Sequence, residues 1–256
     1  MTVLGIVGSP RKNGRTNALI DALLRGAAQE GVNTKKVYLI DYEIKPFTDP
    51  TGSLDGSSYC PTTLSELCGE ADGIALGAPV YWGDINGLTK DFMDAVEIAG
   101  ANGKPAVGVA IAGGTGKGLL SGVQSLYHFF YHKQMRGIDP TPVSRFNMEK
   151  TLEALQATGA RLAKLSQNKK PFPGETRDAC WPAVLAYYAS MDVLARGPLD
   201  EFMMLAQQLI DISEGDEVEE AKELLDKGLA LIEEGKRPEG AEYVVRSYQI
   251  LYFPPE

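Results

Sequence analysis

Near its start the chain gathers seven polar side chains that could hold a phosphate group. The segment GSPRKNGRTN, residues 8–17, carries three cations and four hydroxyl or amide groups: Ser9, Arg11, Lys12, Asn13, Arg15, Thr16 and Asn17. Positive charge combined with neutral hydrogen-bond donors suits a phosphate monoester dianion better than a carboxylate. The residue types in this segment therefore indicate phosphate binding.

A strand and a helix must position this segment. Residues 3–7 form a short apolar run, typical of a strand that is buried on both faces of a parallel sheet. Gly8 lets the backbone turn, and the leucines and isoleucine of residues 19–24 then recur at helical spacing. The segment thus ends at a helix N-terminus, where free N–H groups and the helix dipole favour an anion.

Two commoner phosphate motifs are absent from the segment. It lacks GxxxxGK[ST], which disfavours an ATP-type loop with bound magnesium, and it lacks GxGxxG, which disfavours a dinucleotide pyrophosphate site. Strand-to-helix turns also favour Gly, Ser and Asn for structural reasons alone. Three cations among four neutral donors exceed what such a turn requires, so the phosphate interpretation is preferred.

Composition narrows the class of protein. Apolar residues make up 44% of the 256 residues, enough for a substantial core. Residues 1–170 hold 18 Lys and Arg against 16 Asp and Glu, whereas residues 171–256 hold 7 against 18, so the acidic excess lies in the tail and disfavours nucleic-acid binding there. No charged leader or membrane-spanning apolar run is evident and the three cysteines form no disulfide framework, so we expect a cytoplasmic protein without a membrane partner.

Further strand and helix patterns follow in alternation. Strands are expected at residues 36–40, 73–76 and 106–111, with a possible fifth, broken by prolines, at 138–143. Helices are expected at residues 64–69, 88–99, 120–130 and 152–165. Residues 41–63 are rich in Pro, Gly, Ser and Asp and predict a long loop, which is usually functional or mobile.

Two more loops follow predicted strands directly. In GAPVYWGDING, we expect Pro79 to end the strand, while Tyr81 and Trp82 offer large flat faces and Gly83 permits close backbone approach. The strand at 106–111 leads into AGGTGKG, a second glycine-rich loop before a helix. Ligands bind at the carboxyl ends of strands in open α/β sheets, so both loops belong to one candidate site.

The order of elements predicts an α/β fold with a doubly wound parallel sheet and an added C-terminal helical segment. We expect a nucleotide-binding domain at residues 1–168, a linker at 169–182 and an acidic helical extension at 183–256. The extension shows apolar residues at helical spacing near 183–194, 199–212, 217–234 and 240–250. Its acidic helix at 216–236 is interpreted as a solvated amphipathic face without chemistry.

Taken together, the loops GSPRKNGRTN, APVYWGD and AGGTGKG resemble those of the flavodoxin-like, NAD(P)H-dependent FMN reductase family, most closely its iron-sulfur flavoprotein branch. The resemblance covers about residues 1–165. It implies a flavodoxin-like FMN-binding domain in which the first loop holds the FMN phosphate, the second lines one edge and face of the isoalloxazine, and the third bonds its pyrimidine end through backbone N–H groups. The residues so implied are, loop by loop, Ser9, Arg11, Asn13, Thr16 and Asn17; Pro79, Val80, Tyr81, Trp82 and Gly83; and Gly113, Gly114, Thr115 and Gly116.

The cysteines depart from the pattern of the iron-sulfur branch, whose cluster needs four converging thiolates. Cys60 stands alone in the corresponding loop, while Cys68 lies near a helix and Cys180 beyond the linker. We therefore expect no iron-sulfur cluster. His128 and His132 have a metal-ligand spacing but lack the glutamate of HExxH and a third ligand, so no metal site is expected.

The leading hypothesis is an FMN oxidoreductase that receives hydride from NAD(P)H and passes electrons to a small molecule or a redox protein, with no dedicated acid or base residue. One alternative is a flavodoxin-like electron carrier that docks on redox partners. A third is a regulatory or assembly protein with a vestigial flavin site. The resemblance also implies a homodimer or tetramer, because related proteins complete the flavin site across a subunit interface.

Overall fold

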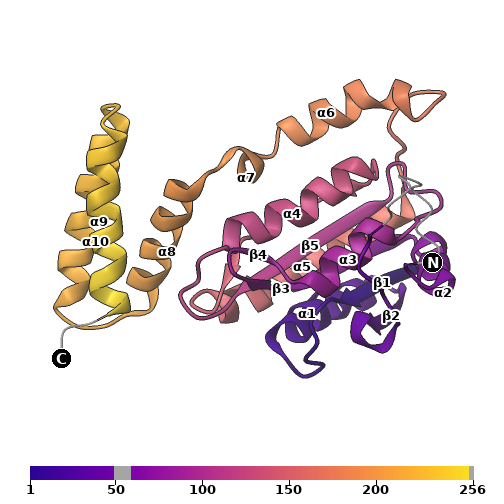
Figure 1. The fold of residues 1–256 in the computed structure, drawn as a ribbon, viewed down its shortest axis with the longest axis horizontal. Coiled ribbons are helices and arrows are strands. Elements are labelled where there is room, and N and C mark those ends of the chain that lie inside the picture. Colours follow the sequence, from indigo (N-terminus) through magenta and orange to yellow (C-terminus); the bar gives the residue numbers. More distant parts are fainter. Residues whose placement is uncertain (49–58, 254–256) are drawn as a thin grey trace.

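The computed structural model describes residues 1–48 and 59–253 and shows a parallel sheet wrapped by helices (Figure 1). The strand order is β2-β1-β3-β5-β6, with β7 also beside β5, and an antiparallel pairing joins β3 to the short β4. The predicted doubly wound parallel sheet is confirmed. The strands are β1 (Thr2–Val7), β2 (Asn33–Tyr38), β3 (Gly73–Tyr81), β4 (Asp84–Ile85), β5 (Pro105–Ala112), β6 (Arg136–Gly137) and β7 (Val143–Ser144).

Helices cover both faces of the sheet and continue beyond it. Short 3-10 turns at Leu39–Asp41 and Asp178–Cys180 add to them. The helices of the sheet domain are α1 (Arg15–Gln29), α2 (Thr62–Glu70), α3 (Gly87–Ala95), α4 (Leu119–His132) and α5 (Met148–Gln167). Those that follow are α6 (Trp181–Ala189), α7 (Asp192–Ala195), α8 (Pro198–Ile212), α9 (Glu217–Glu233) and α10 (Arg237–Tyr252).

Successive side chains of a strand point to opposite faces of the sheet, and they fill one apolar core on each face. On the first face, Leu4 and Ile6 of β1 pack with buried side chains of α2, α3 and α4. On the second, Val3 and Val7 pack with α1 and α5. Both faces of β1 are thus buried, which explains why its sequence is continuously apolar.

Two predicted element boundaries and one predicted strand differ from the structure for local reasons. The strand expected at 36–40 ends at Tyr38, where a 3-10 turn replaces it. The strand expected at 138–143 is wrong. The chain pairs with β5 only before and after this stretch, as the two short strands β6 and β7. Between them Asp139 adopts φ 47°, and two prolines have no N–H to donate to a neighbouring strand. The helix expected at 88–99 ends at Ala95, where Val96 is already extended.

Pro79 was expected to end its strand, and this prediction is also wrong, since β3 continues to Tyr81. The pairing of β3 with β1 stops at Gly77, so beyond that residue β3 pairs on one side with β5 and at its tip with β4. Pro79 can therefore lack an N–H without breaking the ladder to β1.

The long loop expected at 41–63 falls partly on residues 49–58, which lie outside the described residues. Of its remainder, Lys45 N–H donates to the Tyr59 carbonyl, and Thr62 already begins α2. Residues 42–48 adopt no helix or strand.

Residues 169–180, between α5 and α6, are held against the sheet domain. Phe172 and Cys180 are buried, and the Arg136 guanidinium lies 4.3 Å from the centre of the Phe172 ring and 4.8 Å from that of Tyr187 on α6. Tyr188 adds a hydroxyl hydrogen bond of 2.8 Å to the Met135 carbonyl. The chain therefore runs along the domain before it reaches α8.

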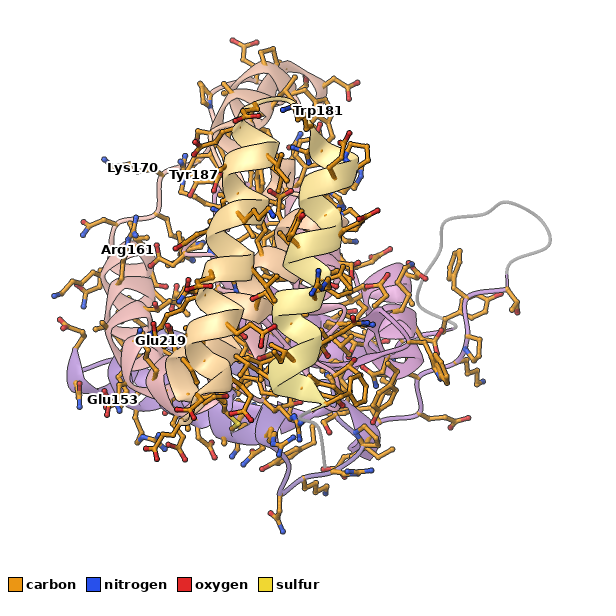
Figure 2. All side chains as sticks on the ribbon, turned by 90° about the vertical axis from the view of Figure 1, so that its left-hand side faces the viewer. Glu153, Arg161, Lys170, Trp181, Tyr187 and Glu219 are labelled. Carbon is orange, nitrogen blue, oxygen red and sulfur yellow. The ribbon has the colours of Figure 1, made fainter. Side chains whose placement is uncertain are left out.

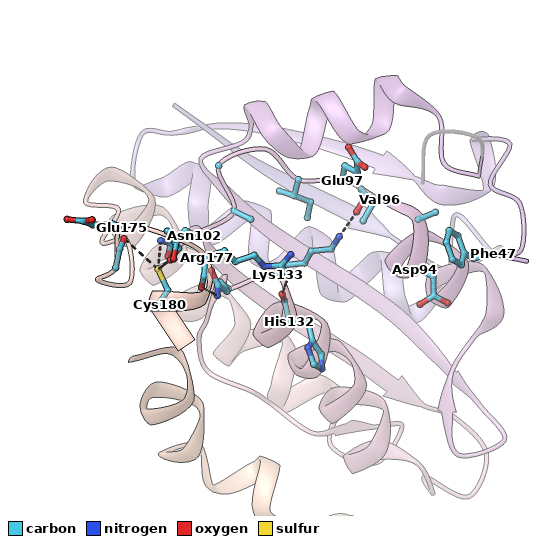
Figure 3. A pocket seen from close by; sticks show the side chains of 17 residues that line it. Phe47, Asp94, Val96, Glu97, Asn102, His132, Lys133, Glu175, Arg177 and Cys180 are labelled. Carbon is cyan, nitrogen blue, oxygen red and sulfur yellow. Dashed lines mark hydrogen bonds between the residues drawn. The ribbon is translucent and has the colours of Figure 1, made fainter. Parts of the chain in front are cut away.

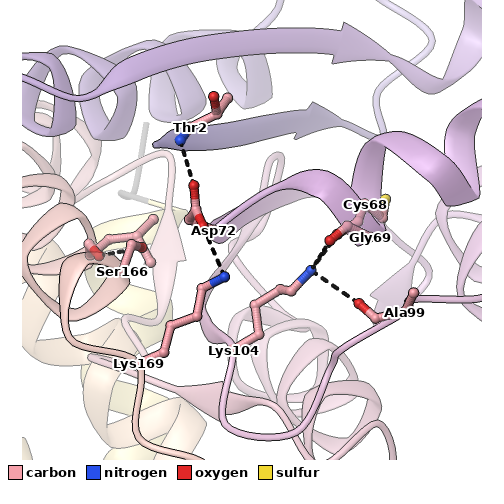
Figure 4. A network of polar contacts seen from close by, with 9 residues as sticks. Thr2, Cys68, Gly69, Asp72, Ala99, Lys104, Ser166 and Lys169 are labelled. Carbon is pink, nitrogen blue, oxygen red and sulfur yellow. Dashed lines mark hydrogen bonds and ion pairs between the residues drawn. The ribbon is translucent and has the colours of Figure 1, made fainter.

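A buried lysine joins α2 to the loop before β5 (Figure 4). The Lys104 ammonium donates to the carbonyls of Cys68 and Gly69 at 2.7 and 2.8 Å, and more weakly to that of Ala99 at 3.4 Å. Two of these carbonyls belong to the last turn of α2, so the lysine satisfies groups that a helix C-terminus leaves unpaired. Burial lowers the pKa of Lys104 to about 8.

The helices α8, α9 and α10 form a third core at one end of the sheet domain (Figure 1). Figure 2 shows α9 and α10 side by side, with Glu219 on the exposed face of α9. The core joins apolar side chains of these helices, such as Leu205 and Val244, to Ala112 and Leu119 at the end of β5 and the start of α4. None of the described helices is long and apolar enough to cross a membrane.

Candidate functional site

The first predicted loop leaves β1 at the carboxyl edge of the sheet and enters α1. Gly8 N–H donates to the Gly77 carbonyl at 2.7 Å, which holds the loop against β3. A Cβ at Gly8 would lie 1.9 Å from Thr89 Oγ1. Only glycine fits here, because the backbone approaches α3 this closely.

Two polar residues under this loop, Asn86 and Thr89, escaped the sequence predictions. Both are buried: the Asn86 amide donates to the Gly8 carbonyl at 2.9 Å, and the Thr89 hydroxyl donates to Asn86 Oδ1 at 2.7 Å. The available signal was an asparagine directly before a helical segment, a common N-cap residue. These residues connect the first loop to α3, just beyond the second.

The N-terminus of α1 faces the first loop without a side-chain cap from the described residues. Its first turn therefore keeps N–H groups for a bound anion. Arg11 and Arg15 are exposed, as is Asn13, while Ser9 is buried and its hydroxyl accepts the Arg11 N–H at 3.1 Å. This combination of cations, N–H groups and a hydroxyl fits a phosphate.

Two polar residues of the first loop and α1 are paired with protein side chains, and a third is buried. Lys12 pairs with Asp41 at 2.5 Å. Asn17 donates to Asp21 at 2.8 Å and accepts from Lys36 at 2.9 Å. Thr16 is buried, and its methyl group would lie 3.0 Å from a Cβ at Gly77. Asn17 and Thr16 therefore have clear structural roles at the start of α1, and their predicted contact with phosphate stays a prediction.

The second predicted loop is the tip of a β-hairpin. Val80 and Tyr81 pair with β4, and the two turn residues Trp82 and Gly83 both have positive φ, 53° and 88°. Two-residue hairpins favour such angles, but a tryptophan at positive φ is strained. Tyr81 is half-exposed and Trp82 is fully exposed, so two flat aromatic faces stand at the carboxyl edge of the sheet.

The third predicted loop follows β5 and ends at α4. A tight turn closes it, with Gly116 N–H donating to the Gly113 carbonyl at 2.7 Å. Within the described residues no acceptor engages the N–H groups of Gly114 and Thr115. Donors of this kind suit the carbonyl oxygens of a flat heterocycle, especially if these gain negative charge.

A cleft of about 620 Å³ lies between the second and third loops. Its volume is typical of a small-molecule site. Neither Pro79 nor Gly116 lines it. Arg15 does not line it either, but its guanidinium lies near Gly113, 4.0 Å from a Cβ built on that lining residue. The cleft is lined by Val80, Tyr81, Trp82, Gly83, Gly113, Gly114, Thr115 and Lys117.

The three loops together fit a flat ring that carries a phosphate. Aromatic faces and glycine backbone suit a ring system, and the uncapped end of α1 with its arginines suits the phosphate. A flavin mononucleotide has both parts. The sequence predictions for the second and third loops are thus brought into one cleft, with the first loop beside it.

A larger cavity, of about 750 Å³, lies between the C-terminal end of α4, the loop before β5 and residues 174–180 (Figure 3). Its cations already have partners, because Lys133 donates to the Val96 carbonyl at 2.7 Å and Arg177 to the His132 carbonyl at 2.9 Å. Burial and the charge of Arg177 lower the pKa of Lys133. The cavity lies near the amino end of β5, away from the three loops, and we assign it no ligand.

The fold and the cleft define a flavodoxin-like, flavin-dependent oxidoreductase. Residues 1–145 match the family model described as NADPH-dependent FMN reductase. This chain belongs to that family, as its three loops predicted.

Curated relatives agree with this assignment. An iron-sulfur flavoprotein of Methanocaldococcus jannaschii is 33% identical over 153 residues, which cover 55% of this chain and 79% of the relative. One from Archaeoglobus fulgidus is 29% identical over 126 residues, covering 46% of this chain and 57% of the relative. The matched part is thus about half of the chain.

Solved structures show the same fold. An NADH:FMN oxidoreductase in its apo form aligns with a TM-score of 0.50 at 20% identity and covers 70% of this chain and 92% of that one. RosB, solved with 8-demethyl-8-formylriboflavin-5'-phosphate, gives 0.50 at 17% identity and covers 77% and 90%.

All three cysteines are free and buried in the structure. Burial raises the pKa of Cys60 and, to about 12, that of Cys68, and Cys180 lies behind Phe172 and Thr176, whose carbonyls are 3.5 and 3.3 Å from its sulfur. Burial at Cys60 and Cys68 disfavours the thiolate form, which is the form that binds a metal. Among the described residues no group of three or more His, Cys, Asp or Glu side chains could hold a metal ion.

Proposed function

We propose that this chain is an FMN-dependent oxidoreductase that accepts hydride from NADPH or NADH and delivers electrons to a second acceptor. The observation that carries the proposal is the cleft between the hairpin tip at Tyr81–Trp82 and the loop at Gly113–Thr115, joined through Arg15 to the uncapped N-terminus of α1. Family membership supports the flavin part of this proposal, and the donor and acceptor are our inference.

Each loop has a separate duty in this proposal. The first binds the phosphate through Ser9, Arg11 and the N–H groups that begin α1. The N–H groups of Gly114 and Thr115 bond the ring and stabilise negative charge at its pyrimidine end. Bound FMN supplies the hydride chemistry, while Tyr81 and Trp82 shape the space for the nicotinamide and the acceptor.

The test is anaerobic reduction of the FMN-saturated protein by NADPH and by NADH. Loss of the visible flavin absorbance after addition of either donor is expected, with the faster donor identifying the preferred nicotinamide. Failure of the protein to take up FMN contradicts the flavin site. FMN uptake without reduction by either donor contradicts the enzyme and leaves the binding site intact.

That last outcome favours the alternative function, an electron carrier that docks on redox proteins. Residues 171–256 hold 7 Lys and Arg against 18 Asp and Glu, and α8 packs against the start of α4 beside the cleft. An acidic excess in the C-terminal helices suits a basic protein partner. A carrier exchanges electrons with such a partner and is not reduced directly by a nicotinamide.

We also propose that the flavin works without an iron-sulfur cluster and that a second subunit covers the exposed Trp82. Anaerobic reconstitution with iron and sulfide tests the first point, because retention of iron after gel filtration would contradict it. Light scattering tests the second, with a dimer or tetramer expected. A Trp82 that stays accessible to a fluorescence quencher in the oligomer contradicts coverage of the cleft.

A further inference from the structure

Two of the C-terminal helices reach the third loop of the candidate site. Helix α8 and helix α10 both lie beyond residue 145, where the family match ends. Three kinds of contact join them to residues 113–120: a helix cap, a tyrosine hydrogen bond and close packing.

The helix cap comes from Glu201 of α8. Its carboxylate accepts the N–H groups of Gly118 and Leu120, each at 3.0 Å. Gly118 is the N-cap residue of α4, with φ 90°, and it has no side chain with which to cap the helix. A carboxylate at this position satisfies two unpaired donors and complements the helix dipole. Glu201 thereby fixes where the third loop ends.

The tyrosine hydrogen bond comes from α10. Tyr248 is 2% exposed, and its hydroxyl donates to the Thr115 carbonyl at 2.9 Å. Burial, with the nearby Tyr252, raises the pKa of Tyr248 to about 12, so the hydroxyl remains a donor at neutral pH. The bond holds the carbonyl of Thr115, a residue that lines the cleft.

Close packing leaves the third loop little room to move. A Cβ at Gly116 would lie 2.5 Å from Leu205 Cδ2 on α8. The Lys117 ammonium lies 5.1 Å from the centre of the Phe202 ring and 5.8 Å from that of Tyr248, distances typical of cation–π contacts. Residues of both α8 and α10 thus lie against the loop.

We infer that Glu201 and Tyr248 are positioning residues of the flavin-ring site and that the C-terminal helices form part of it. They hold residues 113–118 in one conformation. In this conformation the N–H groups of Gly114 and Thr115 have no acceptor among the described residues and are available to the flavin ring. Binding of the ring and docking of α8 and α10 share one loop, so each stabilises the other by the same free energy. The inference rests on the proposed FMN site and extends it to residues outside the family match.

The experiment compares the affinities of full-length variants for FMN and for riboflavin, which has the same ring but no phosphate. Glu201→Gln and Tyr248→Phe keep side-chain shape and remove the cap charge and the hydroxyl. Each is expected to weaken binding of both flavins by the same factor, about fivefold to tenfold, as the loss of one hydrogen bond predicts. Matched controls are Glu219→Gln on the exposed face of α9 and Tyr243→Phe on α10, which should bind both flavins as the wild type does.

A second measurement separates positioning from general stability. Amide hydrogen exchange of residues 113–118 in the flavin-free variants should be faster than in the wild type, with the exchange of β1 and β3 unchanged. If a substituted chain fails to fold, the other variant carries the test.

The outcomes are distinct. Wild-type affinities and wild-type exchange in both variants overturn the inference and leave the proposed function standing. Weaker binding of FMN with unchanged binding of riboflavin also overturns it, because the two residues would then affect the phosphate site and not the ring site. Absence of flavin binding in the wild type overturns the proposed function and this inference with it.

Discussion

The Asn86 side-chain amide donates a 2.9 Å hydrogen bond to the Gly8 carbonyl, which ties the first loop to the start of α3. Asn86 N–H donates in turn to the Pro79 carbonyl at 3.1 Å. One buried residue therefore contacts both the loop proposed to bind phosphate and the strand that leads to the hairpin tip. The relative position of the two loops depends on this contact.

Thr89→Val should loosen this contact. The substitution keeps the shape of the side chain and removes the hydroxyl that donates to Asn86 Oδ1 at 2.7 Å. We expect the free energy of unfolding to fall by about 1–2 kcal/mol, because a buried acceptor loses its partner. Urea denaturation measures it. Thr63→Val on the exposed face of α2 is the control, and equal stability of both variants would contradict the role of Thr89.

Arg11→Ala should weaken FMN binding by about tenfold and leave riboflavin binding unchanged, since only FMN carries the phosphate that a charge-assisted hydrogen bond would hold. Fluorescence titration of both flavins measures this. Arg25→Ala, an exposed arginine of α1 outside the loop, should bind both flavins as the wild type does. Equal loss for the two flavins would place Arg11 near the ring instead.

Substitutions of Trp82 should separate stability from activity. Trp82→Gly relieves a bulky residue from φ 53° and should raise the free energy of unfolding by about 1 kcal/mol. It also removes a flat face from the cleft, so the rate of flavin reduction by NAD(P)H should fall. Trp82→Phe keeps a flat face and should retain more activity. Full activity of the glycine variant would show that no aromatic face is needed there.

Lys104 should make stability depend on pH. Its pKa is about 8 in the folded protein against 10.5 for an ordinary lysine, because burial disfavours the charge. Between these values the unfolded chain binds more protons than the folded one, so this residue's contribution to stability rises with pH. The free energy of unfolding of the wild type, minus that of Lys104→Met, should increase by on the order of 2 kcal/mol from pH 8 to pH 10.5. Lys150→Met, exposed on α5, should show no such difference, and a flat profile for Lys104→Met would contradict the lowered pKa.

Local patterns in the sequence were sufficient to predict the parallel sheet and the positions of the three loops. Residues 3–7 and 106–111 are apolar because both faces of β1 and β5 are buried, and such runs can be recognised without tertiary information. The prediction that Pro79 ends its strand was wrong because proline is excluded from a strand only where its missing N–H would bond a neighbouring strand. Whether β3 has such a neighbour at Pro79 depends on where β1 ends, which the local sequence does not indicate.

The contacts that complete the site could not be predicted in the same way. Glu201 and Gly118 are far apart in sequence, as are Asn86 and Gly8. The residues around each of them do not indicate which distant residue it will contact. Glu201 in particular stands in the first turn of α8, where an acidic residue is common for its own helix and gives no sign of a partner on α4. Pairings of this kind depend on how whole helices dock.

The hydrogen bond from Tyr248 to Thr115 spans 133 positions of the chain. During synthesis the ribosome completes β1, β3 and β5 long before it makes α10, and contacts between distant segments form late. The third loop can therefore acquire its tyrosine only after α10 has been made. The proposed ring site is accordingly completed only after synthesis has passed well beyond residues 1–145, the segment that matches the family model.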